Sequence, residues 1–479
     1  MGVKVARLFQ WTLVDRIGSA GILFLCMMIL ARFVTPKDFG AIGALTLFIS
    51  LGNLLVDCGL GGALIKKKDA SPTDFGTLFV YNGVCSISLY VLFWLLAPLV
   101  NWFFRDDSLA RVLKVLSLIF IFNAISIVQY VKLVKNLEVK KLCLISIASG
   151  GLACIIAIVM AVHGCGVWAC VFYFVLQSLF RSCGYYLVIW QIPHFCFSWQ
   201  SFKQQFNFGG YLLGANILTV VSSHLTTFAI GRMFPMSVLG YYYQAHRLYS
   251  ANSELLTAVI DRVAFPVLCK STDQESMQVN SKNIFNPLFV LLYPLFAVGV
   301  VVAEQFVVIA FGELWRSSGI YFAILLVSLF PAMVRIMLRN IFKSAGATGL
   351  IFRAELLTIV FTLILVGCSL FISILCLVGS MVGSMFFTMF TYMFYSHSRG
   401  LVKCQDVCAM IASPLCSALA SAGVAVLVQC VGNKWCPPVV TCCAAGFAGV
   451  VTAFVYYAVT KNPVCLQFSE RIKRKRQAP

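Results

Sequence analysis

The sequence predicts an all-α polytopic membrane protein with about 14 transmembrane helices, built as two parallel-repeat six-helix lobes plus two C-terminal helices. Three observations predict this fold: a very apolar composition, apolar runs long enough to span a bilayer, and an internal repeat. Of the 479 residues, 61% are hydrophobic and only 11% are charged, and the mean hydropathy is +0.92. Soluble domains are roughly 45–50% apolar and about 25% charged. The composition therefore excludes a soluble enzyme.

Long apolar runs alternate with short polar breaks along the whole chain. A spanning helix needs about 20 predominantly apolar residues, and breaks such as Thr35–Asp38 and Ala70–Thr73 contain the residues typical of loops. The division of 350–396 depends only on a turn between Ser373 and Ser380. We expect spans at 9–33, 39–65, 76–104, 109–131, 142–163, 166–190, 208–231, 238–262, 284–312, 318–341, 350–372, 374–396, 406–431 and 439–460.

Basic residues are distributed unequally between alternate loops. Counted from a cytoplasmic amino terminus, 24 Lys and Arg lie on the inner side, 7 on the outer side and 5 inside spans. Because cytoplasmic loops carry an excess of Lys and Arg, we expect both termini in the cytoplasm. The first apolar run reaches Phe33 without a cleavage site, so we interpret it as a span and not a signal peptide. The bias of basic residues toward the cytoplasmic side accounts for most of the net charge of +19. We therefore expect no nucleic-acid partner.

A repeat of about 200 residues divides the chain into two halves. The run from Ile29 to Gly40 reappears as Ile230 to Gly240, with Arg and Gly at the same spacing. The offset equals six spans, an even number, so both halves have the same orientation. We expect an N-terminal lobe of six helices, a cytoplasmic linker, a C-terminal lobe of helices 7–12, an extra helix pair and a polybasic cytoplasmic tail at 1–190, 191–207, 208–396, 397–460 and 461–479.

The repeated arginines, Arg32 and Arg232, lie at the outer ends of their spans. We interpret both as structural, because a cation at a helix end satisfies terminal carbonyl groups and reaches the interface. The tail from Arg471 to Arg476 is interpreted as a contact with membrane lipids on the inner face.

Charged side chains inside the spans are costly to bury and usually face a bundle interior or a water-filled cavity. Four arginines from four helices predict a cationic cavity between the lobes: Arg16, Arg181, Arg247 and Arg335. Its natural ligand is an anion, and the planar guanidinium suits phosphate. Ion pairs of Asp15 with Arg16 and of Arg247 with Glu254 are the structural alternative.

Other polar residues of the same spans could contact sugar hydroxyls or take part in gating: Asp15, His224, Tyr243, His246 and Glu254. An interfacial aromatic belt is an equal alternative for the tyrosines 241–243. Cys404, Cys408 and His397 have irregular spacing and lack a fourth ligand, so we expect no metal site. No cofactor is expected either.

Several short motifs together resemble a known family. Ile29–Gly40 is followed by Asp57–Leu60 and Ala63–Lys66, and the second half contains, in order, Leu239–Leu248, Phe265–Pro266, Phe311–Gly312 with Trp315, and Ala345–Ala347. This set resembles the bacterial polysaccharide transporter family, which includes the O-antigen (lipopolysaccharide biosynthesis) flippases of the multidrug/oligosaccharidyl-lipid/polysaccharide superfamily. The resemblance covers nearly the whole chain.

The resemblance implies a flippase that moves an undecaprenyl-pyrophosphate-linked oligosaccharide across the bacterial cytoplasmic membrane by alternating access. It also implies membrane lipids, a polysaccharide polymerase and glycosyltransferases as partners. Span 7 departs from the family pattern, since it carries His224 and Thr226 where members often have an acidic group. Coupling to an ion through that position is therefore not expected.

Two other functions remain open on the sequence alone. A multidrug or cation antiporter of the same superfamily would need a buried carboxylate, for which Glu254, Glu304 and Glu355 are candidates. A membrane polymerase or ligase would need a large outer loop to hold the acceptor, and every predicted outer loop is short. We therefore expect a transporter without enzymatic activity.

Overall fold

The computed structural model describes residues 2–67, 69–191, 195–271, 273–432 and 437–460, and every regular element in these ranges is a helix. The tail predicted at 461–479 lies outside the described residues. The helices are α1 Gly2–Leu30, α2 Pro36–Asp57, α3 Leu60–Lys66, α4 Pro72–Phe104, α5 Leu109–Leu116, α6 Leu118–Lys135, α7 Val139–Val162, α8 Val167–Val188, α9 Trp199–Met233, α10 Met236–Leu268, α11 Gln274–Phe311, the 3₁₀ turn η1 Glu313–Trp315, α12 Arg316–Val327, α13 Leu329–Ser344, α14 Thr348–Ser369, α15 Ile374–Ser398, α16 Cys404–Gly432 and α17 Pro438–Val459.

Twelve helical stretches in the described residues are long and apolar enough to cross a membrane. The protein is therefore a multi-span membrane protein. The two long helices α9 and α10 are not among the twelve, and α10 carries His246, Arg247, Glu254 and Asp261, which lower its hydropathy. The number of fourteen spans thus stays a prediction.

Two helix starts use the same local chemistry. Thr35 and Ser71 are N-caps, each followed by a proline, and each forms a capping box with an aspartate three residues later, Asp38 and Asp74. A capping box satisfies two backbone N–H groups that a helix start leaves without partners. Proline at the first helical position removes no hydrogen bond, because a backbone N–H at that position has no partner within the helix. The sequence identified both stretches as loops, so the spans predicted at 39–65 and 76–104 begin three and four residues after the observed helix starts.

Three predicted spans contain a helix break. The run 39–65 bends at Cys58 and Gly59, which both adopt left-handed backbone conformations with φ of 45° and 70°. The runs 109–131 and 318–341 are interrupted at Ser117 and Ser328, which separate α5 from α6 and α12 from α13. By contrast, the expected turn in 350–396 is confirmed, because Ser373 caps α15 by accepting a hydrogen bond from the N–H of Cys376 at 3.2 Å.

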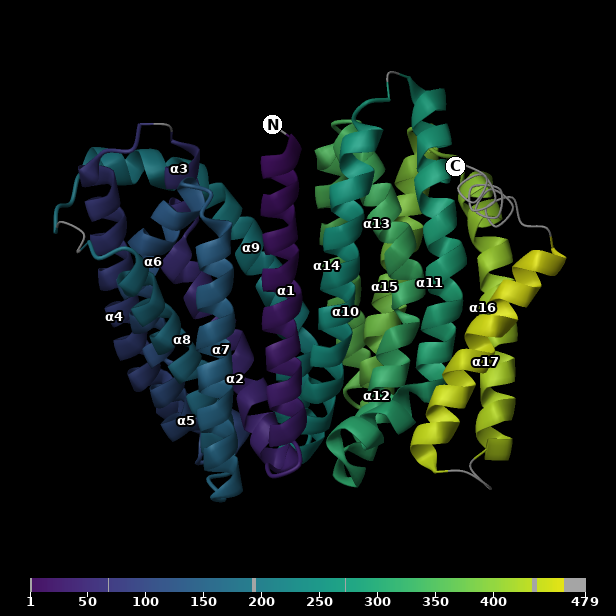
Figure 1. The fold of residues 1–479 in the computed structure, drawn as a ribbon, viewed down its shortest axis with the longest axis horizontal. Coiled ribbons are helices and arrows are strands. Elements are labelled where there is room, and N and C mark those ends of the chain that lie inside the picture. The colour runs from purple at the N-terminus through teal and green to yellow at the C-terminus, as the bar shows by residue number, and fades with distance from the viewer. Residues whose placement is uncertain (1, 68, 192–194, 272, 433–436, 461–479) are drawn as a thin grey trace. The chain divides into compact units, whose positions relative to one another are not determined.

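The chain forms two compact units, residues 1–243 and 244–479. In the first unit, α7 packs against both α1 and α8, and α6 packs against α4 and α8 (Figure 1). In the second unit, α11 packs against α12, α16 and α17, while α14 packs against α15. The last helix pair, α16 and α17, is thus part of the second unit. The units divide within α10, the second helix of the predicted C-terminal lobe.

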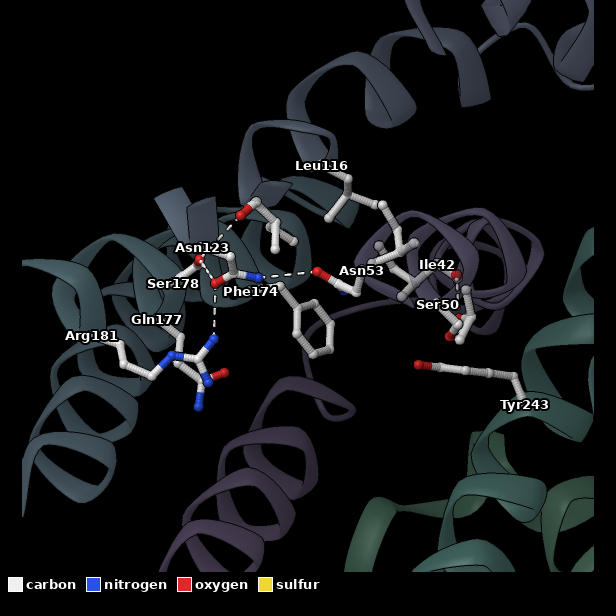
Figure 2. Close-up of a pocket in the computed structure, with 13 residues that line it drawn as sticks. Ile42, Ser50, Asn53, Leu116, Asn123, Phe174, Gln177, Ser178, Arg181 and Tyr243 are labelled. Carbon is white, nitrogen blue, oxygen red and sulfur yellow. Dashed lines mark hydrogen bonds between the residues drawn. The ribbon is translucent and has the colours of Figure 1, made fainter. Parts of the chain in front are cut away.

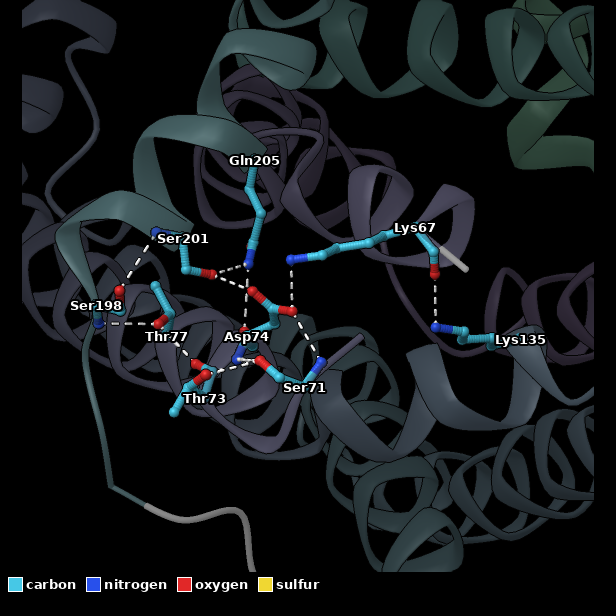
Figure 3. Close-up of polar contacts among 9 residues, drawn as sticks. All are labelled: Lys67, Ser71, Thr73, Asp74, Thr77, Lys135, Ser198, Ser201 and Gln205. Carbon is cyan, nitrogen blue, oxygen red and sulfur yellow. Dashed lines mark hydrogen bonds and ion pairs between the residues drawn. The ribbon is translucent and has the colours of Figure 1, made fainter. Parts of the chain in front are cut away.

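Helix α9 begins at Trp199, within the predicted linker 191–207. Its first turns are hydrogen-bonded to the start of α4 (Figure 3). The buried Asp74 carboxylate accepts a hydrogen bond from Ser201 Oγ at 2.5 Å and pairs with Lys67 Nζ at 2.8 Å. Gln205 Nε2 donates to Ser201 Oγ at 2.9 Å and to the Asp74 carbonyl at 3.3 Å. One aspartate therefore caps α4 and holds α9.

Candidate functional site

A polar pocket of about 200 Å³ lies inside the first unit. Four of its helices, α2, α5, α6 and α8, contribute to the wall together with Tyr243 at the start of α10 (Figure 2). The pocket is smaller than the roughly 300–1,000 Å³ sites that enclose drug-sized ligands. It therefore accommodates one chemical group of a larger ligand.

The polar wall follows from helical spacing. On α8, Phe174, Gln177, Ser178 and Arg181 recur at three- and four-residue intervals, which places them on one face. On α2, Thr46, Ser50 and Asn53 do the same. Each helix thus presents a polar stripe to the pocket within an otherwise apolar span. The full described lining is Ile42, Thr46, Ile49, Ser50, Asn53, Leu116, Ile119, Asn123, Phe174, Gln177, Ser178, Arg181 and Tyr243.

Arg181 is held by a short chain of hydrogen bonds (Figure 2). Its Nη2 donates to Asn123 Oδ1 at 2.9 Å, and Ser178 Oγ donates to the same oxygen at 2.7 Å. Asn123 Nδ2 in turn donates to Asn53 Oδ1 at 3.0 Å. A guanidinium offers five N–H donors, and the chain uses one of them. Arg181 therefore keeps donors for a ligand while its position is fixed.

Tyr243 reaches the pocket because α2 has a glycine where the two helices meet. A Cβ placed on Gly43 would lie 2.9 Å from both Cβ and Cγ of Tyr243. Such a distance is too short for a side chain at position 43. Of the predicted site residues, the structure thus brings Arg181 and Tyr243 to one pocket.

Asp15 and Arg16 lie on α1, outside the described lining of the pocket. Ser19 Oγ donates a hydrogen bond to Asp15 Oδ1 at 3.5 Å. Arg16 is exposed in the isolated chain. Both residues are described, and they form no ion pair with each other, so the structural alternative for Arg16 lacks support.

Arg335 has a carboxylate partner in the second unit. Its Nη1 lies 3.4 Å from Glu355 Oε1, and the Tyr392 hydroxyl donates to the same oxygen at 2.9 Å. In the same unit, His246 Nδ1 and Ser250 Oγ lie 3.4 Å apart, Arg247 is half-buried and Glu254 is exposed. His224 is half-buried on α9, in the first unit.

Other charges from the predicted spans have structural partners. Lys114 Nζ lies 4.1 Å from the centre of the Trp94 ring, and Glu304 pairs with Arg316 at 2.6 Å. Arg232 Nη1 donates to the carbonyl oxygen of Phe103 at 2.5 Å, at the end of α4. The structural interpretation of Arg232 is confirmed, although the carbonyl groups belong to a neighbouring helix. No group of three or more metal-ligating side chains occurs in the described part of the chain.

Comparison with known proteins decides the family. Residues 29–319 match the family described as polysaccharide biosynthesis protein, which is more than half of the chain. The chain belongs to this family. The resemblance found from the sequence motifs is therefore confirmed.

Two curated relatives of this family member show how far the likeness extends. The chain is 26% identical over 315 residues to the lipopolysaccharide biosynthesis protein WzxC of Escherichia coli, covering 64% of this chain and 63% of that protein. It is 24% identical over 313 residues to the succinoglycan biosynthesis transport protein ExoT of Rhizobium meliloti, covering 65% and 63%. The matched region thus spans somewhat less than two thirds of these relatives.

The fold is shared with a solved flippase. The lipid II flippase MurJ in an inward closed conformation matches with a TM-score of 0.77, covering 96% of this chain and 100% of that chain at 11% identity. At this identity the likeness concerns the fold alone. It confirms an all-α membrane fold for nearly the whole family member.

Asn53 and Asn123 were missed from the sequence, although both line the pocket. They are neutral, so they did not stand out among apolar residues as the arginines did. A signal was present, because carboxamides are costly to bury without hydrogen bonds, and one lies in the second predicted span and one in the fourth. The two carboxamides indicate a shared polar site only when α2 and α6 are known to be in contact.

Proposed function

We propose that this protein is a flippase that moves an undecaprenyl-pyrophosphate-linked oligosaccharide, an O-antigen or exopolysaccharide repeat unit, across the bacterial cytoplasmic membrane. The observation that supports it best is Arg181, a guanidinium held in place inside a polar pocket of the first unit. A charge kept within a span is costly unless it serves a ligand or has a partner charge. The family membership, and the names of its relatives WzxC, a lipopolysaccharide biosynthesis protein, and ExoT, a succinoglycan biosynthesis transport protein, support the same substrate class.

The proposed mechanism requires no covalent step. Pyrophosphate oxygens accept hydrogen bonds from the free edge of the Arg181 guanidinium, which stays charged at any physiological pH. Thr46, Ser50 and Tyr243 add hydroxyl groups at the same pocket. Binding to one conformation more tightly than to another then shifts the populations of an inward-open and an outward-open state. Alternating access follows from that shift.

The remaining arginines and polar residues belong to the same proposal. Arg16, Arg247 and Arg335 are proposed as further contacts of the pyrophosphate during the transport cycle. In this proposal Arg335 leaves its ion pair with Glu355 and binds the pyrophosphate instead. Asp15, His224, His246 and Glu254 are proposed as sugar or gating contacts. In this assignment α9 and α10 are the seventh and eighth spans, which complete the fourteen. Both termini are cytoplasmic, and a polymerase and glycosyltransferases act on the same substrate.

A multidrug or cation antiporter has less support. Such an exchanger needs a carboxylate that can release and take up the coupling cation. Glu355 is paired with Arg335 and hydrogen-bonded by Tyr392, and Glu304 is paired with Arg316. The described lining of the pocket contains a cation and no carboxylate.

The test is complementation of a strain of the native host from which the gene has been deleted. Arg181→Ala, expressed at low level, is expected to leave the lipid-linked repeat unit inside and to abolish surface polysaccharide. Arg111→Ala, at an exposed arginine of α5, is the matched control and is expected to restore it. Full restoration by Arg181→Ala at equal protein level would falsify the role of Arg181, and failure of the unaltered protein to restore transport would overturn the function.

A further inference from the structure

The Asn123 carboxamide has a single orientation that satisfies its neighbours. Its acceptor receives hydrogen bonds from Arg181 Nη2 at 2.9 Å and Ser178 Oγ at 2.7 Å. Guanidinium nitrogens only donate, so exchanging the oxygen and nitrogen of Asn123 would set two donors against each other. Oδ1 therefore faces Arg181, and Nδ2 faces α2.

The orientation of Asn123 fixes that of Asn53. Asn123 Nδ2 donates to Asn53 Oδ1 at 3.0 Å, which directs the Asn53 amide nitrogen away from Asn123. Among the hydrogen bonds of the described residues, none is donated by this nitrogen. Asn53 thus offers two N–H donors beside the pocket, on the opposite side of Asn123 from Arg181 (Figure 2).

The two ends of the chain of hydrogen bonds therefore both offer N–H donors beside the pocket. Arg181 contributes its unused N–H groups and Asn53 its amide nitrogen. The described lining residues include no Asp or Glu, and hydroxyl groups such as that of Ser50 can also donate. A cluster of donors with one fixed positive charge and no carboxylate selects an anion with several acceptor oxygens.

We propose that Asn123 is a positioning residue that makes this pocket selective for a phosphate group, and that Asn53 is a direct phosphate contact. The proposal rests on the proposed function and names two residues for it. Asn123 acts through two other residues. Its Oδ1 fixes the position of the Arg181 guanidinium, and its Nδ2 fixes the orientation of the Asn53 carboxamide. Ser178 supports it by occupying the second lone pair of its oxygen.

Binding of undecaprenyl pyrophosphate to the purified full chain in lipid nanodiscs tests this inference, with undecaprenol as the ligand that lacks phosphate. Asn123→Ala and Arg181→Ala are each expected to weaken binding about ten- to a hundredfold, the loss that accompanies a hydrogen bond to a charged group. The double variant is expected to lose less affinity than the sum of the two single losses, because Asn123 acts in part through Arg181 and coupled residues are not additive. Undecaprenol is expected to bind all variants equally.

Two further variants separate positioning from folding. Ser182→Ala removes a neighbouring bond between α8 and α6, in which Ser182 Oγ donates to the Phe122 carbonyl at 2.6 Å, and is expected to lower the melting temperature without changing affinity. Asn123→Asp has the same shape but ties Arg181 to a charge and presents an acceptor to Asn53. It is expected to bind more weakly than Asn123→Ala.

Two outcomes would overturn the positioning role of Asn123: additive losses of affinity in the double variant, or unaltered affinity of Asn123→Asp. Asn53→Leu with unaltered affinity would overturn the direct contact. If Arg181→Ala itself binds normally, the proposed phosphate contact at this pocket fails, which is distinguishable from a failure of Asn123 alone.

Discussion

Gly40 and Gly240 lie against each other where the start of α2 meets the start of α10. A Cβ placed on Gly240 would lie 1.7 Å from the carbonyl oxygen of Pro36, and one placed on Gly40 would lie 1.9 Å from that of Met236. These glycines occupy equivalent positions in the two copies of the sequence repeat, eight residues after Arg32 and Arg232. The repeat therefore brings together two helix starts that touch through their backbones.

Substituting either glycine by alanine should destabilise the protein. The carbonyl oxygens in contact belong to the backbone, so relief requires the helices to separate, at a cost of at least about 1–3 kcal/mol. We expect Gly240→Ala to lower the melting temperature of the purified protein in detergent. Gly83→Ala is the control, because a Cβ at Gly83 of α4 meets nothing within 4 Å. Equal melting temperatures of the two variants would contradict the close contact.

The junction of α4 and α9 should depend on Asp74. Its side chain is 3% exposed, and Asp74→Asn weakens the contacts with Lys67 and Ser201 together. Loss of a charge-assisted hydrogen bond costs about 1.5–3 kcal/mol. We expect faster proteolysis within residues 195–206 in the variant. Lys67→Ala should have a smaller effect, because Lys67 is 40% exposed and the Ser201 bond remains. The opposite order of the two variants would show that the ion pair, and not the buried carboxylate, holds α9.

Asp106, in the turn between α4 and α5, gives a prediction about pH. Partial burial raises the pKa of this carboxyl, but hydrogen bonds from Ser108 and the charge of Lys37 outweigh burial, so its pKa lies below the ordinary value of 3.8. A lowered pKa stabilises the folded state above 3.8, and the contribution is lost as the pH falls through the folded-state pKa. We expect Asp106→Asn to melt below the unaltered protein at pH 7, and this difference to shrink as the pH falls below 3.8. A constant difference across this range would exclude titration of Asp106 as the cause.

The polar breaks beside two helix starts, and the family, were predictable because their signals are local, although the predicted spans begin at 39 and 76 and the helices at Pro36 and Pro72. Thr35-Pro36 and Ser71-Pro72 contain the cap, the proline and the aspartate that make a helix start, and all lie within four residues. The break at Ser117 was not predictable, since no Gly or Pro accompanies the serine within an otherwise apolar run, and the break at Ser328 was missed although Pro331 follows it three residues later. Local chemistry thus placed the ends of spans better than the interruptions within them.

The candidate site was predictable only in part, for a related reason. Arg181 stood out because an unpaired charge in an apolar run is costly. Its partners Asn53 and Asn123 are 70 residues apart and meet only when α2 packs beside α6. Arg335 was identified by the same cost as Arg181, yet it has Glu355 beside it. The sequence therefore identifies the charged residues within spans. The packing then shows which of them is held by a neutral side chain, as Arg181 is, and which is paired with a carboxylate, as Arg335 is.

Glu355 should control whether Arg335 is available to a phosphate group. Its Oε1 lies 3.4 Å from Arg335 Nη1 and accepts a hydrogen bond from Tyr392. Glu355→Gln removes the negative charge but keeps the shape and an acceptor for Tyr392. If Arg335 serves the substrate, this variant should bind undecaprenyl pyrophosphate more tightly than the unaltered protein, and Arg335→Ala should bind it more weakly. Because each variant also removes the ion pair, both should melt at lower temperatures. Lower melting temperatures with unaltered affinity would assign Arg335 to the stability of the second unit and remove it from the substrate contacts.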